Sequence, residues 1–179
     1  LVRRLYDAGS RDVEVTSFVP PTWIPQLADA EQVVASLDVP SGARAVGLVP
    51  NLRGLQRALD AGIREVSVVV SATESFAQAN LNTTRSGAID RAVEVIQAAT
   101  AQGIPVRGYV SMAFGDPWEG EVETDAVTSA ARALHEAGAR TVAISDTIGV
   151  ATPGHTTAII DETRAVGIPT DAIALHLHD

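Results

Sequence analysis

Two histidines stand two positions apart at the end of the sequence, in residues 175–179 (LHLHD), directly after the apolar run 171–175. In an extended strand, alternate side chains point to the same face, so His176 and His178 are expected to project together. Two neutral imidazoles that converge from one strand end supply half of a metal site. The spacing alone also suits a structural pair of histidines, so the surrounding elements must decide between the two.

Two carboxylates are further candidates for chemistry. Glu14 lies inside an apolar strand sequence, where an unpaired carboxylate would be costly to bury. It is expected either to pair with an arginine or lysine or to act in catalysis. Asp146 directly follows the apolar segment 141–145 and suits a cap of the next turn as well as a catalytic acid or base.

Arg107 and Tyr109 share one face of another strand sequence, and Ser111 continues that face. An arginine at such a position either forms an ion pair with Glu14 or Asp146, or binds an anionic ligand.

The order of elements indicates how these residues are brought together. Segments with strand character alternate strictly with helical segments, which predicts parallel strands joined by right-handed crossovers. The expected strands are residues 12–18, 44–49, 65–70, 105–112, 141–145 and 171–175, and the expected helices are 26–37, 52–61, 86–102, 124–136 and 153–166. Residues 71–82 are expected to form a long polar loop, in which Asn80 and Asn82 bond their own backbone or, as the minority alternative, contact a ligand.

The loops favour a barrel over an open doubly wound sheet. Nearly every expected strand is followed by polar residues, whereas the turns after the helices are short and plain. A polar face at the carboxyl ends of all strands is the arrangement of the TIM-type (β/α)8 barrel. A doubly wound sheet often carries a glycine-rich phosphate loop, and no such motif occurs here. We therefore predict an incomplete α/β barrel of about six βα units, lacking the first and last strands, as one partial catalytic domain over residues 1–179.

Composition excludes several functions. Hydrophobic residues make up 46% of the chain and charged residues 20%, enough for a real core, while the formal net charge is −9 and no basic run occurs. Nucleic acid and anionic membranes are therefore not expected as partners. There is no cysteine, so disulfides and cysteine chemistry are excluded within this sequence. The sequence also contains no run of about 20 apolar residues, the length needed to span a membrane.

Six sequence blocks, in order and with matching spacing, resemble 3-hydroxy-3-methylglutaryl-CoA lyase, a metal-dependent barrel enzyme related to Claisen-type synthases. The blocks are residues 13–20 (VEVTSFVP), 23–29 (WIPQLAD), 71–76 (SATESF) with 80–82 (NLN), 106–111 (VRGYVS), 145–150 (SDTIGV) and 176–179 (HLHD). They extend over nearly the whole chain.

The resemblance implies a role for each candidate. His176 and His178 match ligands of a divalent cation, Mg²⁺ or Mn²⁺. Asp146 matches an acidic residue near the substrate hydroxyl, a candidate for proton transfer, and Glu14 matches a carboxylate that supports catalysis or orients the metal shell.

The same resemblance implies that Arg107, Tyr109 and Asn82 bind substrate. The implied reaction is the retro-Claisen cleavage of 3-hydroxy-3-methylglutaryl-CoA to acetyl-CoA and acetoacetate. We accordingly expect an acyl-CoA as the substrate, a homodimer as the oligomeric state and the cytoplasm as the location.

The sequence departs from the family at both ends. The family's D-x-x-x-R-D-G motif, which supplies an Asp ligand and an Arg, is absent, as are its catalytic cysteine and a later Asn ligand. We interpret this as truncation and expect the fragment itself to be inactive, because two histidines alone hold a cation weakly. The alternatives are a related aldolase or Claisen-type synthase acting on a 2-oxo acid, and a non-catalytic truncated barrel.

Overall fold

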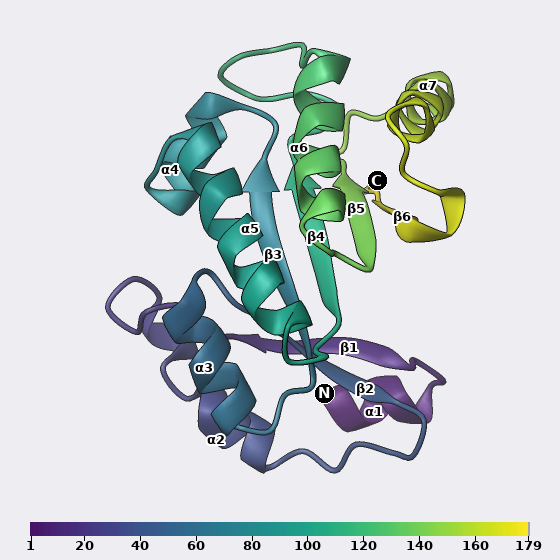
Figure 1. Ribbon diagram of the computed structural model, residues 1–179. Coiled ribbons are helices and arrows are strands. Elements are labelled where there is room, and N and C mark those ends of the chain that lie inside the picture. The colour runs from purple at the N-terminus through teal and green to yellow at the C-terminus, as the bar shows by residue number, and fades with distance from the viewer. Residues whose placement is uncertain (179) are drawn as a thin grey trace.

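Six parallel strands form one sheet in chain order. The computed structural model describes residues 1–178, so Asp179 of the HLHD block lies outside the described residues. The strands are β1 (Asp12–Ser17), β2 (Arg44–Leu48), β3 (Glu65–Ser71), β4 (Val106–Ser111), β5 (Thr141–Ser145) and β6 (Ile173–His176). Each strand pairs in parallel with the next, and the sheet twists so strongly that β1 and β2 lie across the direction of β3 and β4 (Figure 1).

The strand order confirms the barrel arrangement. A doubly wound sheet reverses its strand order at a switch point, whereas this sheet never reverses. With right-handed crossovers throughout, an unreversed order places all helices on the same face of the sheet. The opposite face is thereby left for the side chains of a barrel interior.

The helices cover one face of the sheet, with α5 and α6 side by side in front of β3, β4 and β5 (Figure 1). They are α1 (Val2–Asp7), α2 (Ala30–Ala35), α3 (Leu52–Asp60), α4 (Glu74–Leu81), α5 (Arg85–Thr100), α6 (Thr124–Glu136) and α7 (Pro153–Ala165), with short 3₁₀ turns at Pro25–Leu27 and Thr170–Ala172. Asn51 Oδ1 caps α3 by accepting a hydrogen bond from Gly54 N at 2.9 Å, as its position before the helix predicts. Among residues 1–178, no helix combines the length and apolar character needed to cross a bilayer.

Two predicted segments differ from the structure. The predicted loop 71–82 contains α4, in which Glu74 accepts a hydrogen bond from Gln78 one turn later. Only Ala77 of this helix is buried, so its apolar stripe is too weak to stand out in the sequence. The predicted helix 26–37 is a 3₁₀ turn followed by the short α2, because the backbone of Asp29 leaves helical geometry between them.

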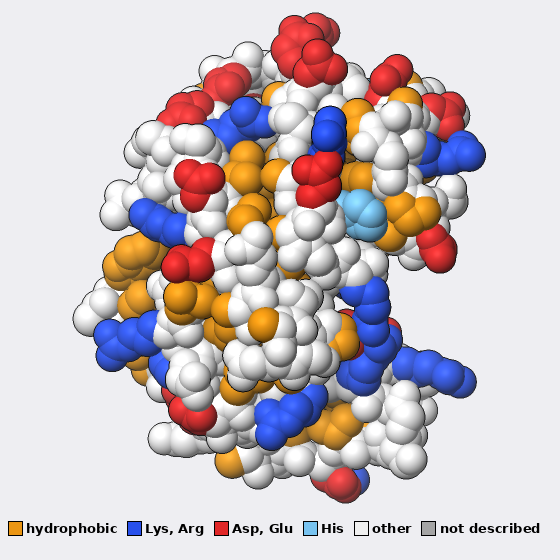
Figure 2. All heavy atoms as spheres, viewed as in Figure 1, with side chains coloured by type: hydrophobic (Ala, Val, Ile, Leu, Met, Phe, Trp, Pro, Cys, Tyr) orange, Lys and Arg blue, Asp and Glu red, His pale blue; other side chains and the backbone are white. Residues whose placement is uncertain are grey.

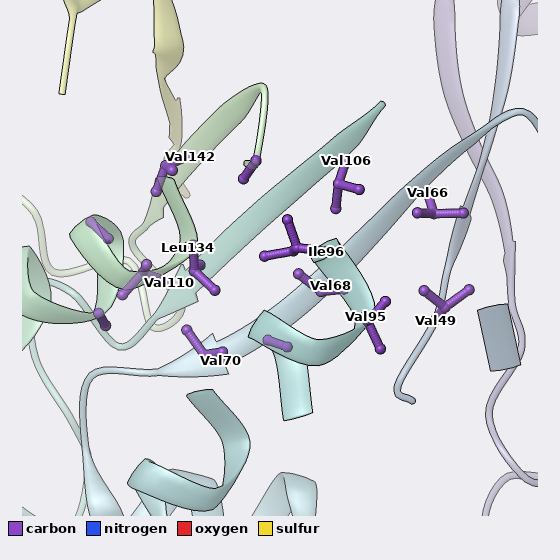
Figure 3. Packing of buried hydrophobic residues seen from close by; sticks show 14 of the residues in the cluster. Val49, Val66, Val68, Val70, Val95, Ile96, Val106, Val110, Leu134 and Val142 are labelled. Atoms are coloured by element: carbon purple, nitrogen blue, oxygen red, sulfur yellow. The ribbon is translucent and has the colours of Figure 1, made fainter. Parts of the chain in front are cut away.

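The hydrophobic core lies between the sheet and the helices. Outward-facing valines of β3, β4 and β5 pack against α5 and α6 (Figure 3), and each is 2% exposed or less. Among the residues labelled are Val66, Val68, Val70, Val106, Val110 and Val142 of the strands, with Val95, Ile96 and Leu134 of the helices. Burying one such side chain stabilises the fold by about 1.5–3 kcal/mol. A core of small aliphatic residues suits strands that are covered closely by helices.

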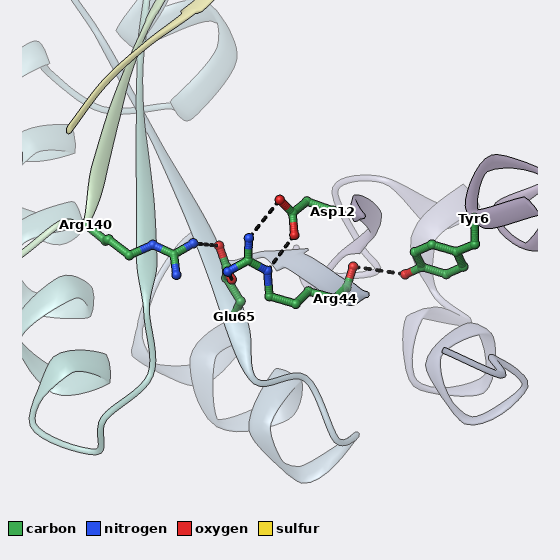
Figure 4. Close-up of polar contacts among 5 residues, drawn as sticks. All are labelled: Tyr6, Asp12, Arg44, Glu65 and Arg140. Carbon is green, nitrogen blue, oxygen red and sulfur yellow. Dashed lines mark hydrogen bonds and ion pairs between the residues drawn. The ribbon is translucent and has the colours of Figure 1, made fainter. Parts of the chain in front are cut away.

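A network of charged side chains lies at the amino ends of the strands (Figure 4). Glu65 is 4% exposed and accepts a hydrogen bond from Arg140 Nη2 at 2.7 Å, while its second oxygen lies 3.2 Å from Arg44 Nη1. The hydrogen bond from Arg44 holds the pKa of Asp12 below its ordinary value. Tyr6 of α1 donates to the carbonyl of Arg44 at 3.0 Å, so the network joins α1 to three strands.

The surface seen from the helical side carries both charge signs. Figure 2 shows acidic side chains gathered along the upper edge, where the loop before α6 lies. Four acidic residues in and after this loop are exposed, namely Glu119, Glu121, Glu123 and Asp125. An anionic ligand is therefore disfavoured at this edge.

Gly108 of β4 gives a direct test of the core. A Cβ atom there would lie 2.7 Å from Leu134 Cδ1, so α6 packs closely only because this position has no side chain. We expect Gly108→Ala to lower the free energy of unfolding by about 1–3 kcal/mol through overpacking. Urea denaturation of the complete protein measures this. Gly154→Ala is the matched control, since nothing lies within 4 Å of its Cβ position, and equal losses in the two variants would contradict the packing argument.

Candidate active site

The strand register gathers polar side chains on the face opposite the helices. In parallel strands, residues paired in register point to the same face, and Ser145 is paired with His176 while Tyr109 is paired with Ala143 and Val69. A cavity of about 330 Å³ opens on this face toward the carboxyl ends of the strands. It is lined by Glu14, Leu48, Val69, Tyr109, Ser111, Ser145, Thr147, His176 and His178.

His176 and His178 converge, as their spacing predicts. Their Nε2 atoms lie 3.1 Å apart and their rings meet edge to face, with centroids 4.9 Å apart. Neighbouring ligands of an octahedral cation at about 2.1 Å would be separated by about 3.0 Å, so the pair fits two such positions. Without a cation, one Nε2–H can donate to the other ring. Among residues 1–178, no group of three or more His, Cys, Asp or Glu side chains could hold a metal ion.

Glu14 lies in the same cavity and is exposed to it. Ser67 Oγ donates to Glu14 Oε2 at 2.6 Å, and no ion pair with Glu14 is found among the described residues. The predicted arginine or lysine partner is therefore replaced by a serine from β3. Because Ser67 engages one oxygen only, the other carboxylate oxygen is open to a ligand.

Tyr109 is half-buried on the floor of the cavity, with its ring centroid 6.1 Å from that of His176. Burial raises the pKa of the Tyr109 hydroxyl, and the negative charge of Glu14 raises it further. The phenol is therefore protonated at neutral pH and can donate a hydrogen bond to a ligand oxygen.

The structure does not bring Asp146 into the cavity. Its side chain is 1% exposed, and its two oxygens accept hydrogen bonds from the amides of Val150 at 2.9 Å and Ala151 at 3.0 Å. Asp146 thus caps the loop after β5, which is one of the two roles that the sequence left open. That loop carries Thr147, which lines the cavity.

Arg107 and Asn82 also lie outside this cavity. Arg107 stands near the amino end of β4 and lines a smaller cavity of about 90 Å³, which shares Glu14 and Tyr109 with the main cavity and also includes Asp12 and Glu65. Asn82 is exposed and ends α4 in the left-handed conformation, with φ of 48°. The family blocks that contain these residues do not show at which height of a strand, or on which side of a helix end, each side chain lies.

A second cavity of about 260 Å³ adjoins the first and shares Leu48 and Val69 with it. Its wall is mainly apolar and includes Trp23 and Leu81, with Asn80 and Arg91 among its polar members. Trp23 therefore walls a cavity at the carboxyl ends of the strands. Asn80, rather than Asn82, is the asparagine of its block that faces a cavity.

Sequence reasoning missed three hydroxyl groups of the main cavity, those of Ser111, Ser145 and Thr147. The sequence places Ser111 on the face of Arg107 and Tyr109, but nothing in the pattern assigned it a role. Ser145 required knowledge of the register with β6, and Thr147 required the fold of a loop.

Asp116 fastens two loops beside the site. Thr73 Oγ1 donates to Asp116 Oδ2 at 2.6 Å, and the amides of Trp118 and Glu119 donate to Oδ1 at 2.7 and 3.0 Å. Burial alone would raise the pKa of Asp116, but these hydrogen bonds outweigh it and lower the pKa below its ordinary value. The loop after β4 is thereby tied to the loop after β3.

The sheet and the cavity define the class of protein. Sequential parallel strands, helices on one face and polar side chains at the carboxyl ends of the strands form part of a TIM-type βα barrel. The family model described as HMGL-like matches residues 1–179, so the chain belongs to the HMGL-like family.

Curated relatives match the whole chain. The mitochondrial hydroxymethylglutaryl-CoA lyase of Arabidopsis thaliana is 42% identical over 179 residues, which are 100% of this chain and 38% of the plant protein. The 3-hydroxy-3-isohexenylglutaryl-CoA/hydroxy-methylglutaryl-CoA lyase of Pseudomonas aeruginosa is 40% identical over 100% of this chain and 59% of its own length.

Solved structures agree with this placement. The HMG-CoA lyase of Brucella melitensis superposes with a TM-score of 0.95 at 40% identity, over 99% of this chain and 62% of that one. The HMG-CoA lyase of Acinetobacter baumannii in complex with coenzyme A and 3-methylmalate gives 0.91 at 29% identity, over 99% and 57%. The resemblance and the barrel fold inferred from the sequence are confirmed, and the chain spans 38 to 62% of the length of these four proteins.

The Asp116 contacts predict a pH dependence. A carboxylate whose pKa is lowered by folding adds stability above its unfolded pKa, and this contribution is lost as the pH falls through the folded value. We expect Asp116→Asn to be less stable than the wild type at pH 7, with the difference shrinking as the pH falls below the ordinary value of 3.8. Urea denaturation across this range measures the difference. A gap that stays constant with pH would contradict it, and Asp90→Asn on the exposed side of α5 controls for the loss of one charge.

The histidine pair predicts a metal affinity. We expect His178→Ala to weaken Mn²⁺ binding by the complete protein at least about tenfold, because one of two converging nitrogen ligands is lost. Calorimetric titration with Mn²⁺ measures the dissociation constant. His135→Gln near the end of α6 removes a histidine that does not line the cavity and should bind Mn²⁺ as the wild type does. Unchanged affinity of the His178 variant would remove this pair from the metal site.

Proposed function

We propose that the complete protein carrying this chain is a hydroxymethylglutaryl-CoA lyase, which cleaves 3-hydroxy-3-methylglutaryl-CoA to acetyl-CoA and acetoacetate. The observation that carries the proposal is the convergence of the two histidine Nε2 atoms, 3.1 Å apart, in a cavity that Glu14 and Tyr109 also line. The named relatives support it. A divalent cation, Mg²⁺ or Mn²⁺, would be held by His176 and His178 and would supply positive charge to the hydroxyl and carboxylate oxygens of the substrate.

The reaction needs one proton to leave and one to arrive. The proton leaves the C3 hydroxyl, whose O–H electrons become the C=O bond of acetoacetate. The bond between C2 and C3 breaks, its electrons form the thioester enolate, and a proton added at C2 gives acetyl-CoA. A carboxylate, a neutral donor and positive charge within one cavity are the groups that such a cleavage requires.

Glu14 is our candidate to accept the hydroxyl proton. Ser67 Oγ fixes one of its oxygens at 2.6 Å, and the other oxygen is open to the cavity. Tyr109, kept protonated by burial and by the charge of Glu14, is the candidate to donate a hydrogen bond to the substrate. Arg107 lies two residues before Tyr109 on β4 and lines the smaller cavity together with Tyr109 and Glu14, so we assign it a supporting role beside these two side chains rather than contact with substrate.

Proton transfer by Asp146 stays a prediction. Its carboxylate would first have to release the amides of Val150 and Ala151, which hold it at 2.9 and 3.0 Å. In the arrangement described, Asp146 acts on the cavity through the loop that presents Thr147.

The apolar second cavity is our candidate for the pantetheine arm of coenzyme A. It adjoins the histidine cavity through Leu48 and Val69, so a thioester could reach from one to the other. Arg91 on its wall offers positive charge, whereas the loop before α6 is acidic. Anionic phosphates are therefore favoured on the Arg91 side. Substrate contact by Asn82 is not supported, and Asn80 takes its place in the proposal.

The expected cellular location and oligomeric state rest on the resemblance. The relatives include proteins named as cytoplasmic and as mitochondrial, so the cytoplasmic location stays a prediction, as does the homodimer.

The function is tested by the release of acetoacetate from 3-hydroxy-3-methylglutaryl-CoA by the complete protein in the presence of Mn²⁺. We expect Glu14→Gln to lower kcat by roughly 10²–10⁴-fold, the range for loss of a general base, with little change in Mn²⁺ affinity. Ser67→Ala should give a smaller loss, because the carboxylate remains but is less well held.

His178→Ala should lower the rate through loss of metal, whereas His135→Gln should retain it. A wild-type protein that releases no acetoacetate would overturn the proposed function. Near-normal kcat in the Glu14 variant would remove Glu14 from the role of base.

A further inference from the structure

The cavity wall contains a hydroxyl group with no hydrogen-bond partner among residues 1–178. Ser145, the last residue of β5, is 6% exposed and lines the histidine cavity. Its Oγ atom is buried and makes no hydrogen bond within residues 1–178. Burying a hydroxyl without a partner is unfavourable, and such groups in native proteins call for an explanation.

Two serines at neighbouring positions on the same face show the usual outcome. Ser67 Oγ donates to Glu14, and Ser71 Oγ accepts a hydrogen bond from Thr73 N at 3.0 Å. Ser71 is paired in register with Ser111 of β4. Just beyond Ser111, the amide of Ala113 donates a hydrogen bond to the carbonyl of Ser145. Ser71 and Ser145 therefore lie in the same layer of the sheet. Ser17 Oγ at the end of β1 is also buried without a partner among residues 1–178, but Ser17 lines the second cavity. Ser145 is the serine of the histidine cavity whose hydroxyl is both buried and unpaired among the described residues.

The backbone holds Ser145 beside the histidine pair. It is paired in register with His176, and its carbonyl accepts from Ala113 N at 3.1 Å, while Asp146 N donates to the His176 carbonyl at 2.8 Å. Neighbouring parallel strands lie about 4.8 Å apart, so the Ser145 hydroxyl and the His176 side chain leave the sheet together on one face. The position is fixed from both sides and needs no ligand to form.

The charges in the cavity indicate which ligand group comes to this wall. Glu14 on β1 would repel a carboxylate, whereas the two imidazoles at the opposite end of the sheet, with or without a cation, would not. If one oxygen of a carboxylate faces the histidines, the other still needs a donor. A serine hydroxyl is neutral and donates a hydrogen bond without giving up its proton.

We propose that Ser145 Oγ donates a hydrogen bond to the carboxylate of the acyl group and positions that end of the substrate beside His176. The proposal rests on the lyase function proposed above and adds a substrate-positioning residue to it. It also gives the buried hydroxyl the hydrogen-bond partner that it lacks among the described residues.

The test compares Ser145→Ala with Ser71→Ala in the complete protein. The measurements are kcat and KM for the thioester, the dissociation constant of 3-hydroxy-3-methylglutarate in saturating Mn²⁺, the Mn²⁺ affinity, and the free energy of unfolding. Loss of a hydrogen bond to a charged group should raise KM and the dissociation constant of the acid by about 10- to 100-fold in Ser145→Ala. Mn²⁺ affinity should be unchanged, and stability should be unchanged or higher because an unpaired hydroxyl is removed.

Ser71→Ala should show the reverse pattern, with lower stability and unchanged binding of the acid. If Ser145→Ala alters KM and the dissociation constant of the acid by less than about twofold, the positioning role is wrong. The same holds if the variant weakens Mn²⁺ binding by as large a factor as it weakens binding of the acid. If the wild type binds the acid but does not cleave the thioester, and Ser145→Ala still weakens binding, the lyase proposal fails and the Ser145 contact stands. A wild type that neither cleaves the thioester nor binds the acid overturns both.

Discussion

The register of the parallel strands is the constraint on which the site depends. Six strands pair in chain order, so side chains at matching heights form layers across the face opposite the helices. One layer contains Tyr109 with Ala143, and the next contains Ser145 with His176. Backbone hydrogen bonds set this alignment. The strand register therefore brings side chains that are far apart in the sequence close together, even where those side chains are short. A slip of one residue in any strand would turn its polar groups into the helical core.

The two ends of the sheet use polar groups in opposite ways. At the amino ends, Glu65 forms ion pairs with Arg44 and Arg140, so its charge is balanced within the protein, although its Oε2 accepts no hydrogen bond among the described residues. At the carboxyl ends, Glu14 keeps one oxygen open and Ser145 keeps its hydroxyl unpaired. Charges that are balanced within the protein support the fold, whereas polar groups that line a cavity and keep hydrogen-bonding capacity can bind a ligand.

The sequence predicted those features that depend on local pattern. The alternation of apolar runs located all six strands, and the spacing of His176 and His178 predicted that their rings converge. Features that depend on height within the barrel or on loop geometry could not be read in this way. Arg107 and Tyr109 share a face and both line the smaller cavity, yet only Tyr109 also lines the histidine cavity. Asp146 follows its strand as a catalytic acid would, but two amides four and five residues later take its carboxylate.

The backbone of Met112 has a consequence for how the mouth of the cavity can move. Met112 follows β4 with a φ of 57°, a conformation that residues other than glycine rarely adopt, and its amide donates to Thr147 Oγ1 at 2.8 Å. The hydrogen bond connects the loop after β4 to the loop after β5, and Asp116 connects the former to the loop after β3. The loops after β3, β4 and β5 are therefore linked in sequence by side-chain hydrogen bonds. Displacement of one is transmitted to the next two, so this side of the mouth adjusts as a unit.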